Sequence, residues 1–364
     1  MEKVKLGDIA VLINGDRGKN YPSQADITEE GDVPFVNAGH LTGRTIDFGD
    51  MNYISKEKYE KLSSGKFEKG DILYCLRGSL GKKAIVNDDV VGAIASSLVI
   101  IRPDYEKIDG AYLMFSLDSP SIKEQLVKAN NGSSQPNLSA ASVREYQIEL
   151  PDISLQKEVV EKLTRVRNVI DERQKELNLL DEFIKARFVE LFGNGHDGVC
   201  KTERLGDFCK FQQGTQVPVE DQIKEKKEGY TRFLRIVDYT QAPQEPRYVS
   251  VKGREIKEDS VVIVRYGATA GFVGHGYSGI LANNLFEVVP DEAVLSKDFL
   301  YLALKYGTFE KEVHDKAFGA AMPALSFGMM NDIGVVTPDP SEQSGFVGFV
   351  KQVDKSKVVD IKAA

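Results

Sequence analysis

The sequence predicts an α+β protein with two pseudo-repeated globular units, separated by long helices that form an antiparallel coiled coil. Three observations lead to this fold class. The chain has 364 residues, enough for two domains at roughly 150 residues each. Sequence patterns from the first half recur in the second half, and a seven-residue apolar repeat follows the first copy. With 41% hydrophobic and 28% charged residues, the composition is that of a folded globular protein.

The internal repeat sets the domain boundaries. Lys5-Leu6-Gly7-Asp8 recurs as Arg204-Leu205-Gly206-Asp207, and Asp71 to Arg77 lies over Asp259 to Arg265. Farther along, one constant offset of 187 residues carries a series of matches: Ala95 to Pro103 on Ala282 to Pro290, Gly132 on Gly319, Pro136 on Pro323, Pro151 on Pro338, and Gln156 on Gln343. A repeat of this length indicates a duplicated module. We therefore predict globular domains over residues 1–150 and 196–338.

Each globular domain is predicted to contain both strands and helices. Short aliphatic runs between Gly, Asp and Pro are typical of strands, and they occur at Ile72–Leu76, Leu98–Ile101, Val261–Val264 and Leu285–Val289. Longer amphipathic stretches predict helices over Tyr112–Asn130 and Lys297–Lys316.

A long spacer helix is predicted over residues 151–195, beginning near Ser154 and ending at Gly193-Asn194-Gly195. Apolar side chains recur there with the heptad spacing of a coiled coil. The predicted seam consists of Val159, Leu163, Val166, Ile170, Leu177, Leu180, Ile184 and Leu191.

A second, shortened spacer helix is predicted over residues 339–364. Phe346, Val350 and Val353 continue an apolar stripe, although Gly345 and Gly348 lower the helix propensity. Because a long helix with an apolar stripe needs a partner, we expect this segment to pack against residues 151–195. It covers only part of the longer helix, so either the tail is truncated or another chain covers the rest.

Charge and cysteine content limit the function classes. The formal net charge is -8, from 47 basic and 55 acidic residues, so any nucleic-acid contact must come from a local basic site. No uncharged apolar stretch approaches the roughly 18 residues that span a bilayer. The three cysteines, Cys75, Cys200 and Cys209, fit neither a disulfide framework nor a zinc site. These features predict a cytoplasmic protein with reduced thiols.

The sequence lacks the catalytic motifs that would indicate an enzyme. Gly78-Ser-Leu-Gly81-Lys82-Lys83 lacks the spacing and the hydroxyl of a P-loop, and no Pro-Pro pair is present for an amino-methyltransferase motif. The four histidines never fall at metal-ligand spacing, so no metal site is predicted. One alternative is a nuclease in which the carboxylates of Asp339 and Asp360 supply oxygen ligands for Mg²⁺, accompanied by Lys362. The same residues also fit a helix start followed by a charged tail.

The best functional candidates are two glycine-containing loops at matching positions. Glycine lets the backbone approach a phosphate closely, and flanking Arg or Lys can contact phosphates or guanine. A tight turn that needs positive φ explains the same glycines. The candidate DNA-binding residues of these loops are Arg77, Gly78, Ser79, Gly81, Lys82 and Lys83 in the first copy, and Arg265, Gly267, Thr269 and Gly271 in the second.

Two further groups of polar residues are candidates for DNA contact. Asn and Gln amides can read an adenine edge, and arginines can supply concentrated charge. These candidates are Ser133, Ser134, Gln135 and Asn137 in the first copy, and Arg232 and Arg235 in the second. The counterpart of the first group, Gly319 to Ser326, keeps the Gly, Pro and Leu-Ser positions but exchanges polar for apolar side chains.

The motifs together resemble the specificity subunit of type I restriction-modification systems. They are the Lys-Leu-Gly-Asp opening, Gly70-Asp71-Ile72-Leu73 before an Arg-Gly loop, Gly132-Ser-Ser-Gln-Pro-Asn-Leu-Ser139, and Leu150-Pro151 with Gln156 opening a heptad helix. The likeness covers nearly the whole chain. The doubled order of domain, helix, domain, helix is more specific than any single motif.

The resemblance implies a non-catalytic DNA sequence-recognition subunit. Each globular unit would be a target recognition domain that reads one half of a bipartite site in double-stranded DNA, with the helices as an antiparallel spacer. Methyltransferase (modification) subunits and a restriction/translocase subunit would be the partners. S-adenosylmethionine, ATP and Mg²⁺ would belong to those partners, and no cofactor is expected here. The alternative is a duplicated protein-binding scaffold, assembled through a coiled coil, without sequence-specific DNA binding.

Overall fold

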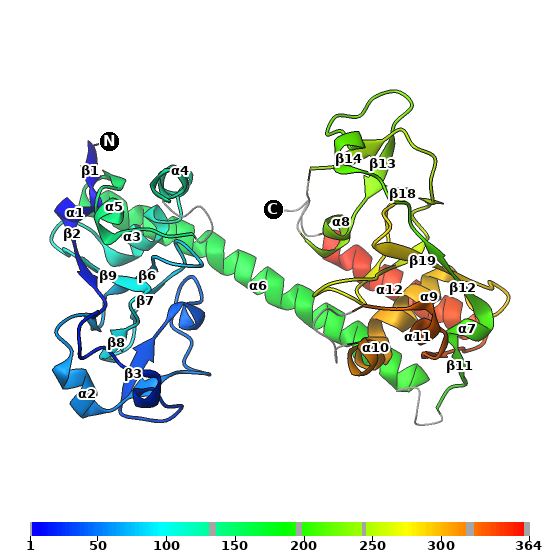
Figure 1. Ribbon diagram of the computed structural model, residues 1–364, viewed down its shortest axis with the longest axis horizontal. Coiled ribbons are helices and arrows are strands. Elements are labelled where there is room, and N and C mark those ends of the chain that lie inside the picture. Colours follow the sequence, from blue (N-terminus) through cyan, green and yellow to red (C-terminus); the bar gives the residue numbers. More distant parts are fainter. Residues whose placement is uncertain (1, 131–135, 194–198, 242–244, 318–323, 360–364) are drawn as a thin grey trace. The chain divides into compact units, whose positions relative to one another are not determined.

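The computed structural model describes residues 2–130, 136–193, 199–241, 245–317 and 324–359 (Figure 1). The chain divides into two compact units, unit 1 over Met1–Asp171 and unit 2 over Glu172–Ala364. Helix α6 (Ile153–Phe192) begins in unit 1 and ends in unit 2. None of the described helices combines the length and apolar character needed to cross a membrane.

The described part of unit 1 forms three β-sheets. One has the strand order β2-β9-β6-β7, the second has the order β4-β3-β8-β5, and β1 pairs with β10. The strands are β1 (Glu2–Lys5), β2 (Ala10–Asn14), β3 (Val33–Val36), β4 (Tyr53–Ile54), β5 (Lys66–Phe67), β6 (Ile72–Cys75), β7 (Lys83–Ile85), β8 (Gly92–Ile94), β9 (Leu98–Pro103) and β10 (Gln147–Leu150).

Short helices cover these sheets in unit 1. The predicted helix over Tyr112–Asn130 is in fact two helices, because Pro120 begins a new helix and the Ser119 hydroxyl accepts a hydrogen bond from the N–H of Ile122. The helices are α1 (Leu6–Ile9), α2 (Lys56–Lys61), α3 (Gly110–Ser116), α4 (Pro120–Ala129) and α5 (Ala140–Arg144), with 3₁₀ turns at Gln24–Asp26 and Ala38–His40.

Unit 2 repeats the same topology. Its sheet orders are β12-β19-β16-β17, β14-β13-β18-β15 and β11-β20, which match the three sheets of unit 1 strand for strand. The strands are β11 (Thr202–Arg204), β12 (Cys209–Gln213), β13 (Thr231–Leu234), β14 (Arg247–Val249), β15 (Glu255–Ile256), β16 (Val261–Val264), β17 (Val273–Gly274), β18 (Gly279–Leu281), β19 (Leu285–Pro290) and β20 (Gly334–Val336).

The pairing directions match as well. In unit 1, β3 and β8 are parallel, and in unit 2 so are β13 and β18, whereas the other named strand pairs are antiparallel. The duplication inferred from the sequence is confirmed at the level of topology.

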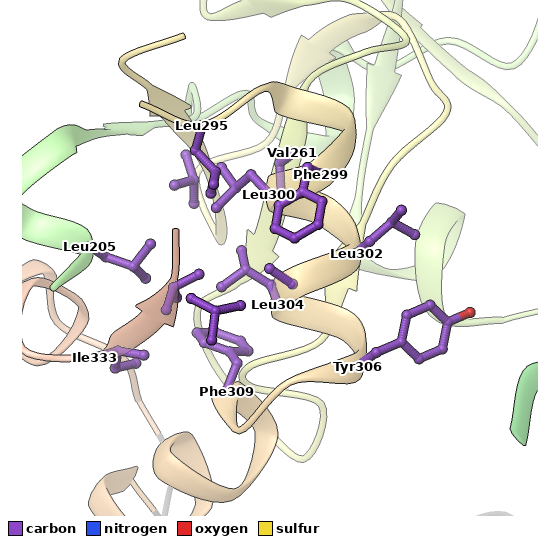
Figure 2. Close-up of a cluster of buried hydrophobic side chains, with 14 of the residues drawn as sticks. Leu205, Val261, Leu295, Phe299, Leu300, Leu302, Leu304, Tyr306, Phe309 and Ile333 are labelled. Atoms are coloured by element: carbon purple, nitrogen blue, oxygen red, sulfur yellow. The ribbon is translucent and has the colours of Figure 1, made fainter. Parts of the chain in front are cut away.

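The hydrophobic core of unit 2 surrounds helix α9, whose buried face carries Phe299, Leu300 and Leu304 (Figure 2). The single helix predicted over Lys297–Lys316 is broken at Gly307, where α9 ends. The helices of unit 2 after α6 are α7 (Leu205–Phe208), α8 (Ile236–Thr240), α9 (Lys297–Tyr306), α10 (Phe309–Ala317), α11 (Phe327–Asn331) and α12 (Pro340–Val359), with a 3₁₀ turn at Val219–Asp221.

Helix α6 is one continuous helix of 40 residues, as the heptad pattern predicted. Pro151 and Asp152 precede it, and the N–H of Leu155 donates to the Asp152 carboxylate at 2.9 Å. Gly193 ends the helix with a φ of 70°, and its N–H donates to the Val189 carbonyl at 2.8 Å. A glycine in this left-handed conformation is a common way to terminate a helix.

Within unit 2, α6 and α12 pack antiparallel, as predicted. The Arg173 guanidinium donates to the Lys357 carbonyl at 2.8 Å. Farther along α6, the centroid of the Phe188 ring lies 5.5 Å from that of Phe346. From Arg173 to Phe188 along α6, the contacting residue on α12 changes from Lys357 to Phe346, so the two helices run in opposite directions.

Only part of the predicted apolar seam is covered. In unit 2, Ile184 is completely buried, and in unit 1, Val159 packs against the core. Leu177, Leu180 and Val353 are half-buried, while Phe346 and Val350 are buried. Four members of the stripe are exposed in this chain, so their contact with another chain stays a prediction: Leu163, Val166, Ile170 and Leu191.

Candidate nucleic-acid interface

The first glycine loop joins β6 to β7 in unit 1. Gly78 and Gly81 have φ values of 79° and 77°, a region that side-chain-bearing residues rarely adopt. A Cβ at Gly81 would also lie 2.6 Å from Leu126 Cδ1, whereas a Cβ at Gly78 would meet no atom within 4 Å. Gly78 is therefore required by the backbone turn alone, and Gly81 by both the turn and the packing.

The second glycine loop joins β16 to β17 in unit 2 and repeats this geometry. Gly267 and Gly271 have φ values of 88° and 91°. A Cβ at Gly271 would lie 2.6 Å from Val313 Cγ1, the counterpart of the Leu126 contact in unit 1. The same turn and the same helix contact are thus present in both units.

The second loop is one residue longer, which changes the equivalence of the two arginines. Arg77 forms an isolated β-bridge with Asn137, and Tyr266 forms the matching bridge with Ala324. The sequence comparison placed Arg77 over Arg265, but the bridges place Arg77 over Tyr266, so that alignment was wrong by one residue. Arg265 takes the place of Leu76. The Leu76 carbonyl accepts a hydrogen bond from the Leu138 N–H, and the Arg265 carbonyl accepts the equivalent bond from the Leu325 N–H.

The predicted residues of unit 1 differ in accessibility. Arg77, Gly78, Ser79 and Asn137 are exposed. The other members of the predicted polar segment, Ser133, Ser134 and Gln135, lie outside the described residues. The exposed group therefore places one arginine and several hydrogen-bonding groups around the first turn.

The two lysines after the first turn differ. Lys82 is half-buried, and its ammonium donates to the Ala38 carbonyl at 3.1 Å. Lys83 is 3% exposed and forms an ion pair with Asp118. Since its charge is turned into the unit, we leave Lys83 out of the proposed DNA contacts.

A neutral histidine lies beside Lys82. The Nδ1 atom of His40 accepts a hydrogen bond from the Asn37 N–H at 3.1 Å. Burial lowers the pKa of His40 from its ordinary value of 6.5, and this outweighs the opposing effect of Asp47 and Asp50. The cation of this region at neutral pH is thus Lys82 and not the imidazole.

In unit 2, Arg265 is held by its own domain. Its guanidinium donates to Gln213 Oε1 at 2.8 Å and to the Leu325 carbonyl at 3.2 Å. The same group lies 4.9 Å from the centroid of the Tyr266 ring and 5.4 Å from that of Phe327. Such contacts orient the arginine, and they place the exposed Tyr266 ring beside it.

Thr269 is exposed at the tip of the second loop, whereas Gly267 and Gly271 are half-buried. Sequence reasoning did not find Tyr266, because it aligned the arginine before it with Arg77. A comparison based on strand register would have placed Tyr266 at the position of Arg77.

Arg232 and Arg235 converge on a buried carboxylate instead of forming an open basic site. The Asp238 side chain is 1% exposed, and its oxygens lie 3.6 Å from the Arg232 guanidinium and 3.0 Å from that of Arg235. The Arg232 guanidinium also stacks 4.6 Å above the Tyr277 ring, and Arg235 donates to the Glu245 carbonyl at 3.0 Å. A buried carboxylate needs such compensation, so both arginines serve first to pair Asp238.

The described residues contain no group of three or more His, Cys, Asp or Glu side chains arranged to hold a metal ion. Asp339 lies just before α12, and its N–H donates to the Glu342 carboxylate at 3.1 Å. The other two residues of the nuclease alternative, Asp360 and Lys362, lie outside the described residues.

Comparison with known proteins identifies the family. A family model described as the type I restriction modification DNA specificity domain matches residues 1–182 and matches again over residues 200–363. The chain belongs to this family. Each of the two matches to the type I specificity family spans all the described strands of one unit, which agrees with the duplicated topology.

Curated relatives carry the same description. The type I restriction enzyme MjaVIII specificity subunit of Methanocaldococcus jannaschii is 22% identical over an alignment that covers 99% of this chain and 87% of that subunit. The EcoBI specificity subunit of Escherichia coli is 24% identical over 49% of this chain, but only 40% of that subunit is covered.

Two solved structures share the fold. A crystal structure of the type I restriction-modification S subunit from M. genitalium covers 98% of this chain and 90% of that one, with a TM-score of 0.51 and 18% identity. A second structure, from work on complex assembly and conformational transition of the type I restriction-modification system, covers 100% and 92%, with a TM-score of 0.52 and 19% identity. At these identities the likeness concerns the fold of the type I specificity family.

Proposed function

We propose that this member of the type I specificity family is a non-catalytic subunit that reads a bipartite site in double-stranded DNA. Unit 1 contacts one half-site through the loop with Arg77 and Lys82, and unit 2 contacts the other through the loop with Tyr266 and Thr269. The observation that carries the proposal is the repeated turn, built at the same place of two identical topologies but with different side chains. A shared backbone geometry with different exposed side chains suits two domains that recognise two different DNA sequences.

The net charge of the chain favours DNA recognition through a few local contacts and not through a broad basic surface. The chain has a net charge of -8, so nonspecific attraction to phosphates is weak unless partners contribute basic surface. Arg77 is exposed, and an arginine can donate two hydrogen bonds to a guanine edge. Tyr266 offers a ring and a hydroxyl at the equivalent point of unit 2, which predicts a different base preference for that half-site.

The proposed partners are methyltransferase (modification) subunits and a restriction/translocase subunit. Support for a protein partner comes from the exposed apolar stripe of α6 within unit 1, where Leu163, Val166 and Ile170 are 40%, 58% and 61% exposed. Contiguous apolar side chains of this kind are typical of protein interaction surfaces. S-adenosylmethionine, ATP and Mg²⁺ would bind to the partner subunits. We propose that the complex assembles in the cytoplasm.

The deciding experiment is a gel-shift titration of the full chain together with its methyltransferase subunits. Candidate duplexes come from single-molecule mapping of methylated adenines in the host genome. We expect a bipartite duplex to be bound at least about a thousandfold more tightly than competitor DNA, in the range of sequence-specific complexes. Equal binding of all duplexes would instead favour the duplicated protein-binding scaffold. Mg²⁺-dependent cleavage by the chain alone, lost in Asp339→Ala, would favour the nuclease.

A further inference from the structure

The strand that leaves the first glycine loop is joined to α6 by an ion-pair relay. Lys83, the first residue of β7, is 3% exposed and pairs with Asp118. The other oxygen of Asp118 lies 3.4 Å from the guanidinium of Arg167 on α6. Arg167 also lies 4.5 Å above the ring of Phe115. A buried lysine needs an anionic partner, so Asp118 connects β7 to the helix.

A second connection holds the other end of the same strand. The N–H of Ile85, the last residue of β7, donates to the Arg44 carbonyl at 2.8 Å. The guanidinium of Arg44 forms a two-pronged ion pair with Asp171, in which one of the two contacts measures 3.1 Å. Arg167 and Asp171 are four residues apart, on adjacent turns of one face of α6. Two turns of α6 therefore hold both ends of β7.

Unit 2 has the same fold, but its described residues do not form this relay. Strand register places Val273 at the position of Lys83. Alignment of the starts of α3 and α9 places Lys305 at the position of Asp118. Alignment of the starts of α6 and α12 places Asp354 at the position of Arg167. Asp354 pairs instead with Lys357 at 2.8 Å, and the Lys305 ammonium lies 5.0 Å from the centroid of the Tyr306 ring. The relay is thus a property of unit 1 and not a requirement of the shared topology.

We propose that Asp118, with Arg167 and Asp171, positions the first glycine loop for DNA reading by fixing β7 to α6. The inference rests on the proposed function, because it assigns these residues a role in how unit 1 reads its half-site. Arg77 and Lys82 lie just before β7, so any movement of the strand on the helix displaces them. The three positioning residues themselves do not touch DNA.

The test uses the double variant Arg167→Ala/Asp171→Ala, which cuts both connections on the α6 side and leaves the net charge unchanged. Asp118→Ala is avoided, because it would leave the buried Lys83 without its partner and could unfold unit 1. The matched control is Glu161→Ala/Arg165→Ala, which removes an ion pair with the same spacing from α6. Arg167→Lys/Asp171→Glu retains both charges and serves as the conservative rescue.

The first measurement is amide hydrogen exchange of the full chain. In the double variant, we expect the amides of Lys83–Ile85 to exchange roughly threefold to tenfold faster, the effect of losing about 1 kcal/mol of local stability. Exchange of Val273–Gly274 in unit 2 should be unchanged, and the control and rescue variants should match the wild type. Unchanged exchange at Lys83–Ile85 would overturn the proposal.

The second measurement is discrimination against single base changes in each half-site by the chain assembled with its methyltransferase subunits. We expect the double variant to lose roughly threefold to tenfold in discrimination at one half-site, while discrimination at the other half-site is kept as an internal control. An equal loss at both half-sites, or no loss despite faster exchange, would overturn the positioning role. If the wild-type assembly showed no sequence discrimination, the proposed function would fail, and the exchange data would still decide whether the relay holds β7.

Discussion

Gln156 and Gln343 make the same three hydrogen bonds, 187 residues apart. The Gln156 carboxamide accepts the Asp109 N–H at 2.8 Å and donates to the carbonyls of Lys107 and Pro151 at 3.1 and 2.8 Å. The equivalent groups around Gln343 belong to Ser296, Val294 and Pro338, at 2.9, 2.9 and 2.8 Å. Each glutamine joins the first turn of a spacer helix to the start of a domain helix.

We expect Gln156→Ala and Gln343→Ala each to lower the free energy of unfolding of their own unit by about 3 kcal/mol. Both side chains are buried, at 0% and 4% exposure, so their removal leaves three backbone groups without partners. Urea unfolding followed by hydrogen exchange assigns each loss to a unit. Gln174→Ala, on the exposed surface of α6, should cost less than about 0.5 kcal/mol; a comparable cost there would contradict the assignment.

The aromatic cluster between α6, α9 and α12 should dominate the stability of unit 2. Phe346 is 2% exposed, and its ring centroid lies 5.5 Å from those of Phe188 and Phe192. Phe346→Ala should lower the unfolding free energy by about 3 to 5 kcal/mol. Phe183→Ala, which removes a ring that is 54% exposed, should cost under about 1 kcal/mol. Equal losses in thermal unfolding would show that α12 does not depend on this cluster.

His275 gives unit 2 a pH-dependent stability. Its ring stacks on Tyr301 at 4.7 Å, and its buried Nε2 has no hydrogen-bond partner among the described residues. Burial lowers the pKa of His275 from 6.5; Asp298 and Asp259 oppose this effect, and Lys351 adds to it. The unfolded chain therefore takes up a proton at a higher pH than the folded chain. The stability contribution is complete above pH 6.5 and is lost as the pH falls toward the folded-state pKa.

The matching measurement is urea unfolding at roughly pH 7.5 and pH 5.5. The wild type should be less stable at the lower pH, and His275→Phe, which keeps a stacked ring but does not titrate, should lose less of the stability of unit 2. His40 in unit 1 also has a pKa lowered by burial, so unit 1 should keep its own pH dependence in this variant. An identical drop in unit 2 with and without His275 would refute the assignment.

Lys82→Ala should weaken DNA binding for all sequences and reduce the slope of the salt dependence by roughly one unit. Arg77→Ala should instead relax one base position, at a cost of about 1 to 3 kcal/mol. Both are measured by titration of the assembled complex at several salt concentrations. Lys107→Ala removes the same charge from a lysine paired with Asp104 and should leave the slope unchanged. A wild-type slope for Lys82→Ala would remove this lysine from the proposed contacts.

The exposed stripe of α6 can be tested with Leu163→Ser/Ile170→Ser. Because both side chains are exposed, the stability of the isolated chain should change by less than about 1 kcal/mol. If a methyltransferase subunit buries them, its affinity should fall by roughly tenfold or more. Leu179→Ser is the control, since Leu179 is 63% exposed and lies on the opposite face of the helix. An equal loss of affinity in the control would argue against a specific surface.

Repetition and periodicity made much of the fold predictable. The offset shared by Pro151 and Pro338 marks the same helix entry in both units, and the apolar repeat from Val159 to Leu191 predicted a single long helix. Periodicity alone could not say which part of the seam is covered. Within unit 2, the buried side chains of α6 are Ile184, Phe188 and Phe192. Their four-residue spacing is that of a helix packed on a globular core and not that of a heptad seam, and it leaves Leu191 exposed.

The candidate site was harder to predict, because charge in a sequence does not reveal its partner. Lys83 follows Lys82 directly, yet Lys82 is the last loop residue and donates to the Ala38 carbonyl, whereas Lys83 begins β7 and pairs with Asp118. The spacing of Arg235 and Asp238 does suggest a local pair, and this signal could have removed Arg235 from the list of candidates. The one-residue difference between the two loops became visible only from strand register.

The reversal of charge between Asp118–Arg167 and Lys305–Asp354 has a consequence for recombination of the gene. In unit 1 these positions hold an ion pair, whereas in unit 2 Asp354 pairs with Lys357. A first module placed on the second helix would bring Asp118 to the position opposite Asp354, and the Lys83–Asp118–Arg167 relay could not form. The relay therefore requires the first module and α6 to stay together, even though both modules share one topology.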